Sequence, residues 1–185
     1  ELDEMITLLN PENGWIQNTN NWPFSAAAEY SPKPENFPNY MANNSENPRG
    51  IHAVRVLENE TNFGLNSLLE AAYDSELPAF EPLVATLVKT ANGQQSSETL
   101  NAAIDALSTW DFRFALESTE TTLASFWGDE LYKRALPLAT NKKMGIYDYL
   151  NNESAPLMLD ALEDAIKTLG SSFGHWQVPW GEVNR

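Results

Sequence analysis

The sequence contains no cysteine, little positive charge and no long hydrophobic run. Without cysteine the chain can form no disulfide and no zinc–thiolate site, and it has no cysteine nucleophile. Eleven Lys and Arg stand against 26 Asp and Glu, so the formal net charge is −15. That balance argues against nucleic acid or an anionic membrane surface as a partner, because phosphate contacts need a basic patch. No apolar stretch approaches the roughly 20 residues that cross a bilayer.

The residues that are present are sufficient for a folded core. Hydrophobic residues make up 42 % of the chain, with six Trp, six Tyr and eight Phe, which excludes a wholly disordered acidic chain. A length of 185 residues suits one domain or slightly more. The sequence begins at Glu1 without Met or a basic signal-peptide region, so we expect it to be a fragment or processed chain of a longer protein.

The first 48 residues are dominated by turn chemistry. Within residues 1–24, a turn at 10–14 precedes a short predicted strand, Trp15–Gln17, and an Asn-rich run follows the strand. Residues 25–48 are rich in proline, which predicts a loop. Large apolar side chains are interleaved with the prolines, and we therefore expect this loop to be ordered.

Residues 48–173 show helical periodicity, and the tail from Ser171 is irregular and aromatic. The sequence Asn47-Pro48 is typical of a helix start, and Gly170 is the predicted end of the last long helix. We predict a mainly α fold, in which five or six amphipathic helices follow the strand and the Asn-rich turn. The fifth helix is expected to end near Ala135. The predicted parts of the chain are 1–24, 25–48 and 49–185.

Few residues outside the Asn-rich run indicate chemistry. His52 and His175 lie far apart and lack metal-ligand spacing, so we interpret both as structural. Tandem asparagines directly after a strand, here in Gln17–Asn21, have two interpretations. They form a turn, or they direct a side-chain amide N–H into a cleft, where it can stabilise an oxyanion. The residues alone favour the turn.

Five segments, taken in order, resemble the penicillin acylase (penicillin amidase) family. These enzymes are N-terminal-nucleophile hydrolases that cleave amides of apolar acyl groups. The run Gly14–Asn20 resembles the family motif G-[WYF]-[IV]-x-N-x-N, and the order of the segments over residues 14–185 is more specific than any one of them. The other segments are Arg49 with Arg55, Leu107–Asp111, Phe126-Trp127 to Lys133-Arg134, and Trp180–Arg185.

The resemblance implies a mechanism and a set of site residues. A maturation cut would free a Ser outside this sequence, whose α-amino group acts as the general base. Asn20 matches the oxyanion-hole asparagine, and Arg49 matches an arginine that positions the nucleophile and the substrate. Asn18 would support the turn, and Phe24 would bind substrate. The whole enzyme would have an αββα core, with the helical segment on its flank.

The resemblance also implies partners, cofactors and location. The chain would assemble with the remainder of the same precursor, meaning the α chain and the rest of the β chain. The substrate would be an apolar acyl amide of a β-lactam nucleus, an acyl-homoserine lactone or a lipopeptide. The reaction requires no cofactor; the full protein could bind calcium, but its ligands cannot be placed in this sequence. A periplasmic or secreted bacterial location is expected, without membrane or nucleic-acid partners.

Two rival hypotheses remain. The chain could be a stand-alone acidic helical binding module, or a relative of the acylases that has lost activity. A segment of a larger hydrolase should expose apolar surface where the absent core belongs. A stand-alone module should not.

Overall fold

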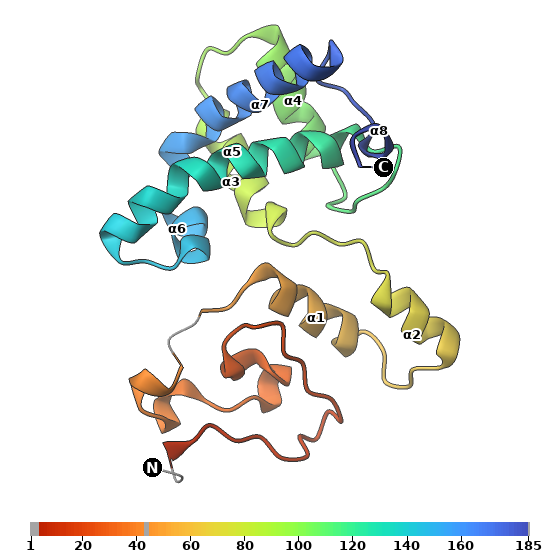
Figure 1. Ribbon diagram of the computed structural model, residues 1–185, viewed down its shortest axis with the longest axis vertical. Helices are drawn as coiled ribbons and strands as arrows, with labels where there is room; N and C mark the ends of the chain where they lie inside the picture. Colours follow the sequence, from red (N-terminus) through yellow and green to blue (C-terminus); the bar gives the residue numbers. More distant parts are fainter. Residues whose placement is uncertain (1–3, 43–44, 185) are drawn as a thin grey trace. The chain divides into compact units, whose positions relative to one another are not determined.

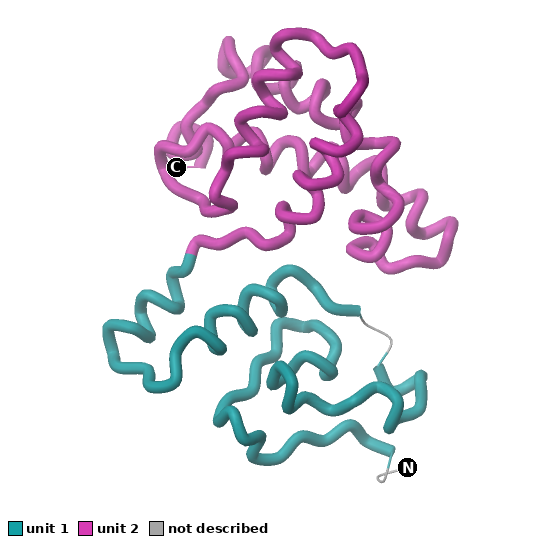
Figure 2. Tube along the Cα trace, turned by 180° about the vertical axis from the view of Figure 1, so that it is seen from behind, with its two compact units in different colours: residues 1–74 teal, residues 75–185 magenta. Residues whose placement is uncertain are grey.

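The structure is a computed structural model that describes residues 4–42 and 45–184. The chain divides into two compact units, residues 1–74 and 75–185 (Figure 2). The predicted division into 1–24, 25–48 and 49–185 stays a prediction about the whole enzyme.

The fold is mainly α, as the periodicity predicts (Figure 1). The helices of the first unit are α1 (Pro48–Glu58) and α2 (Leu65–Ala72), preceded by the 3-10 turns η2 (Pro23–Ser25), η3 (Ala28–Tyr30), η4 (Pro34–Asn36) and η5 (Asn39–Met41). Those of the second unit are α3 (Phe80–Ala91), α4 (Glu98–Ser108), α5 (Thr119–Lys142), α6 (Ile146–Asn152), η6 (Ala155–Leu157), α7 (Met158–Phe173) and α8 (Trp180–Val183).

The predicted strand at Trp15–Gln17 is wrong, since residues 4–42 and 45–184 contain no strand. A strand exists only when a partner completes its ladder of hydrogen bonds. The Gln17 N–H donates to the Ala26 carbonyl at 2.8 Å, but no run of paired residues follows. The segment is therefore an extended link into the Asn-rich turn.

Helix starts are where local sequence signals place them. The Asn47 side chain accepts a hydrogen bond from the Gly50 N–H at 3.0 Å, and Pro48 is the first residue of α1. Ser97 and Ser118 cap α4 and α5 in the same way, through the N–H groups three residues later. These caps satisfy backbone donors that a helix leaves open.

Two predicted helix ends are wrong. α5 continues past Ala135 and Pro137 to Lys142, because proline removes only one backbone donor and the buried Ala139 keeps the last turns against the core. α7 runs through Gly170 and ends before Gly174, whose φ is +86°. The left-handed cap that glycine favours is thus formed four residues later than predicted.

The second unit holds a continuous hydrophobic core. Its buried members extend from Leu83 to Val178, and α5 packs along α7 (Figure 1). Trp127 on α5 is fully buried, and its indole N–H donates to the Met158 carbonyl at 3.2 Å. Among the described residues, no helix is both long enough and apolar enough to cross a membrane.

The first unit is held together chiefly by polar contacts. Ala27 is the one fully buried hydrophobic residue in its described part. The Asn13 side chain donates to the Ala27 carbonyl at 3.0 Å, and the Gln17 side chain donates to the Ser25 carbonyl at 3.1 Å. The Pro-rich loop contains the turns η3, η4 and η5 in its described residues, and Asn43 and Asn44 lie outside them; that it is ordered stays a prediction.

α2 presents an uncovered apolar face. Leu65, Leu68, Leu69 and Tyr73 are 77 %, 54 %, 52 % and 80 % exposed. Singly exposed apolar residues are common, but three on one short helix and a fourth directly after it form a patch of the kind that marks an interaction site.

Candidate functional site

The Asn-rich run forms a tight turn at residues 18–21. Asn20 adopts a left-handed backbone conformation with φ of +60°, which asparagine tolerates better than most side chains. The Asn18 side-chain oxygen accepts a hydrogen bond from the Asn20 N–H at 2.9 Å, an Asx turn. Asn18 therefore shapes the backbone that carries Asn20.

Hydrogen bonds tie this turn to the start of α1, although 25 or more residues separate the two in sequence. The Asn21 side chain donates to Glu46 Oε1 at 2.8 Å. The Asn47 side chain donates to the Thr19 carbonyl at 3.3 Å. Both residues that flank Asn20 are thus anchored to the residues immediately before α1.

Gly50 allows this close approach. It is buried in the first turn of α1. A Cβ atom at this position would lie 2.3 Å from Asn21 Nδ2 and 2.3 Å from Glu46 Oε1, closer than real Cβ contacts. Only glycine fits here without displacing the two side chains.

Arg49 lies one residue earlier, on the exposed side of the same turn of α1. A cation in the first helical turn is electrostatically unfavourable, because the helix N-terminus carries partial positive charge. Within the described residues, neither the Arg49 guanidinium nor the Asn20 side-chain amide has a hydrogen-bond or ion-pair partner. The structure therefore brings together the segments that carry Asn20 and Arg49. Both side chains are left without a partner in the part of the chain that the structure describes.

Phe24 belongs to an aromatic group in the Pro-rich loop. It meets Trp22 edge to face at 5.5 Å between ring centroids, and Phe37 at 6.3 Å. These rings border a pocket of about 290 Å³. The pocket is also lined by Pro34, Pro38, Asn39, Ala42 and Ser45. Phe24 therefore helps to form a concave apolar surface just after the turn.

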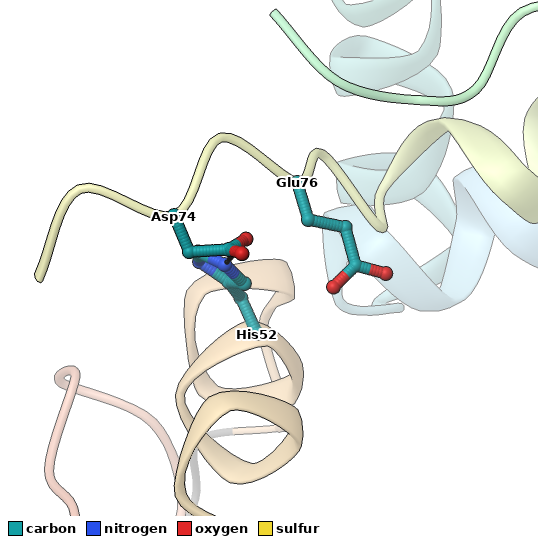
Figure 3. A group of neighbouring side chains, drawn as sticks. All are labelled: His52, Asp74 and Glu76. Atoms are coloured by element: carbon teal, nitrogen blue, oxygen red, sulfur yellow. Dashed lines mark hydrogen bonds and ion pairs between the residues drawn. The ribbon is translucent and has the colours of Figure 1, made fainter. Parts of the chain in front are cut away.

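His52 is a partly buried residue of α1. Its Nε2 lies 2.8 Å from Asp74 Oδ1, and each side chain is 25 % exposed (Figure 3). The pair links α1 to Asp74, two residues after the end of α2. Within either unit taken by itself, the described residues bring no three His, Asp or Glu ligand atoms within 4.8 Å of one another.

Comparison with known families assigns the whole chain to one of them. The family model for penicillin amidase matches the chain over residues 1–185. The chain belongs to the penicillin amidase family. The resemblance deduced from the sequence is therefore confirmed, and the family implies that the full protein is an acylase-type hydrolase of amide bonds.

Sequence reasoning about this penicillin amidase chain missed the residues that anchor the turn. Glu46 and Gly50 were not candidates, since each is unremarkable in its own segment, and Asn21 was considered only as part of the Asn-rich run. One signal could have found Gly50. Glycine inside a helix costs stability relative to alanine, so its presence in the first turn of α1 indicates a close contact.

Proposed function

We propose that the turn at residues 18–21 supplies the side-chain donor of an oxyanion hole. The observation that supports this proposal is the backbone conformation of Asn20 together with the exposure of its side-chain amide. Its backbone is held at φ +60° by Asn18 and by the anchored neighbours of the turn, while its amide remains exposed. An N–H donor without another partner, on a backbone that is already held in place, suits a developing oxyanion, because stabilisation is greatest when the donor needs little reorganisation.

In the proposed reaction, an N-terminal Ser outside this sequence attacks the carbonyl carbon of an amide. Its α-amino group takes the hydroxyl proton, and Asn20 donates a hydrogen bond to the carbonyl oxygen as negative charge develops there. Collapse of the tetrahedral intermediate expels the amine, which takes the proton, and leaves an acyl-enzyme. Water then hydrolyses the ester, with Asn20 again bonded to the oxyanion.

Arg49 would position the amino group of the nucleophile and the substrate. Three locally unfavourable features at this site support a functional origin: the left-handed Asn20, the cation in the first turn of α1, and the glycine beside it. Several residues that are locally unfavourable for a turn or a helix start, found together at one place, are typical of functional sites.

The pocket beside Phe24 would accept an apolar part of the substrate. Its volume of about 290 Å³ suits a small aromatic or short aliphatic group. Amides of a β-lactam nucleus, an acyl-homoserine lactone or a lipopeptide all carry such groups. A periplasmic or extracellular location fits these substrates. No step of the reaction uses calcium or another cofactor.

The rest of the precursor would complete the site and cover α2. The exposed apolar side chains of α2 support this arrangement, because a patch of this kind marks a surface that further protein covers. The nucleophile and the backbone donor of the oxyanion hole would come from that remainder. We therefore expect residues 1–185 alone to be inactive.

Replacing Asn20 with glycine in the full-length enzyme tests this proposal. Glycine adopts φ +60° freely, so the Asn20→Gly change removes the amide without straining the turn. We expect kcat to fall by about 10²–10³, the usual loss for one oxyanion donor, with little change in thermal stability. Turnover would be measured on p-nitroanilides of phenylacetic, hexanoic, octanoic and dodecanoic acids.

Asn10→Gly is the matched control, because Asn10 is also an exposed, left-handed turn asparagine, with φ of +45°. It should retain wild-type turnover. Unchanged kcat in Asn20→Gly would mean that Asn20 is only a turn residue. A wild-type enzyme that cleaves none of the anilides would contradict the proposed acyl class.

A further inference from the structure

We propose that Asn21 and Glu46 are positioning residues that hold the oxyanion turn against the helix carrying Arg49, and that Gly50 is required for their contact. This inference rests on the proposed function. It adds residues to which neither the sequence motif nor the proposed reaction gives a role.

Asn21 uses both ends of its side chain in this contact. Its Nδ2 donates to Glu46 Oε1 at 2.8 Å and to Ser25 Oγ at 3.0 Å, and its Oδ1 accepts from the Thr19 N–H at 3.2 Å. The amide therefore closes the turn internally and ties it to a distant segment at the same time. Rotation of the Asn21 side chain would break all three bonds.

Glu46 completes the connection on the helix side. The same Oε1 that accepts from Asn21 also accepts from the Asn47 N–H at 2.8 Å. Asn47 then caps α1 through Gly50 and donates to the Thr19 carbonyl. Bonds to a carboxylate are stronger than those between neutral groups, so Glu46 is the strongest point of the network.

These contacts involve the sequence neighbours of both proposed functional residues. Asn20 lies between Thr19 and Asn21, each of which is bonded to the segment before α1. Arg49 lies between the cap residue Asn47 and the buried Gly50. A shift of the Asn20 backbone relative to the first turn of α1 therefore requires the network to break. Displacement of a reacting group by about 1 Å can cost roughly 10²-fold in rate.

Gly50 sets how close the two segments come. With a Cβ atom 2.3 Å from both Asn21 Nδ2 and Glu46 Oε1, alanine would push apart two atoms that bond to each other at 2.8 Å. The neighbours are side-chain ends and can move, so the enzyme should still fold. The substitution would instead change the geometry of the turn.

The test compares variants of the full-length enzyme on the anilide that the wild type cleaves best. Gly50→Ala and Glu46→Ala should each lower kcat by about 10²-fold, with a much smaller change in KM, because the geometry of the reacting groups is lost rather than the binding surface. Glu46→Gln keeps an acceptor oxygen at the same place and should recover most of the lost rate. Gly64→Ala is the control, since a Cβ there meets nothing closer than Ser67 Oγ at 4.0 Å, and it should keep wild-type turnover.

The outcomes separate this inference from the function on which it rests. If Asn20→Gly lowers kcat and Glu46→Ala does not, the positioning role is wrong and the oxyanion role stands. If Asn20→Gly is also without effect, both are wrong. Should Gly50→Ala fail to yield folded enzyme, the Glu46 variants decide alone: equal rates in Glu46→Ala and Glu46→Gln would overturn the inference.

Discussion

At the scale of single residues, the start of α1 combines choices that a helix built only for stability would avoid. The chain places an arginine at the positive end of the helix dipole and a glycine beside it. Asn47 and Pro48 offset these costs, because they supply a side-chain cap and a residue preorganised for the first turn. The stabilising contributions of Asn47 and Pro48 let α1 form although the Arg49 side chain has no hydrogen-bond or ion-pair partner within the described residues.

Arg49→Ala should therefore separate stability from activity. We expect it to raise the stability of α1 by about 0.3–1 kcal/mol, since it removes a cation from the helix N-terminus, while it impairs turnover or maturation of the full-length enzyme. Thermal unfolding and anilide hydrolysis on the same preparations would measure both effects. A fully active Arg49→Ala enzyme would refute the positioning role.

Arg55 provides the comparison within the same helix. It lies in the last turn of α1, where a cation is electrostatically favourable, and its side chain has an interaction partner. Arg55→Ala should lower stability and leave kcat largely unchanged, the reverse of the Arg49 pattern.

The residues of the proposed site could be inferred from the sequence to different degrees, and their roles stay predictions. Asn20 and Arg49 could be selected because each belongs to a short motif with fixed spacing. The partner of Asn21 could not be selected from the sequence. Glu46 lies 25 residues away, across a Pro-rich loop whose path no local rule predicts. Contacts between distant segments depend on how the loop folds. Local patterns in a single sequence do not predict the path of such a loop.

At the scale of elements, local signals predicted helix starts better than helix ends. Capping by Asn47, Ser97 and Ser118 depends on residues within one turn, so the sequence shows it directly. The ends of α5 and α7 depend on whether packing against the core outweighs a proline or a glycine. The strand at Trp15–Gln17 failed for a related reason, since its pairing needs a second segment.

The two glycines at the end of α7 should respond oppositely to alanine. Gly170 lies inside the helix with nothing within 4 Å of an added Cβ, so Gly170→Ala should stabilise the 185-residue chain by about 0.5–1 kcal/mol. Gly174 has φ of +86°, so Gly174→Ala should destabilise it, because a side chain is strained in that conformation. Urea unfolding monitored by circular dichroism measures both. Stabilisation by Gly174→Ala would mean that α7 does not end there.

At the scale of the whole molecule, the two units differ in what holds them together. The buried hydrophobic cluster lies entirely between Leu83 and Val178, while the described part of residues 1–74 depends on hydrogen bonds and leaves the apolar face of α2 exposed. A unit with so little core gains little from hydrophobic burial. The segment that carries the proposed site is thus the one whose structure most needs further protein around it.

The most direct test of the central claim is the N-terminal sequence of each chain produced when the whole gene is expressed. If this penicillin amidase chain is the oxyanion-Asn segment of an N-terminal-nucleophile hydrolase, the gene product is cut, and the chain that contains Asn20 begins, upstream of Glu1, with a residue bearing a nucleophilic side chain. We predict Ser there. A product that stays uncut, or whose new N-terminus is not Ser, Thr or Cys, would contradict the account.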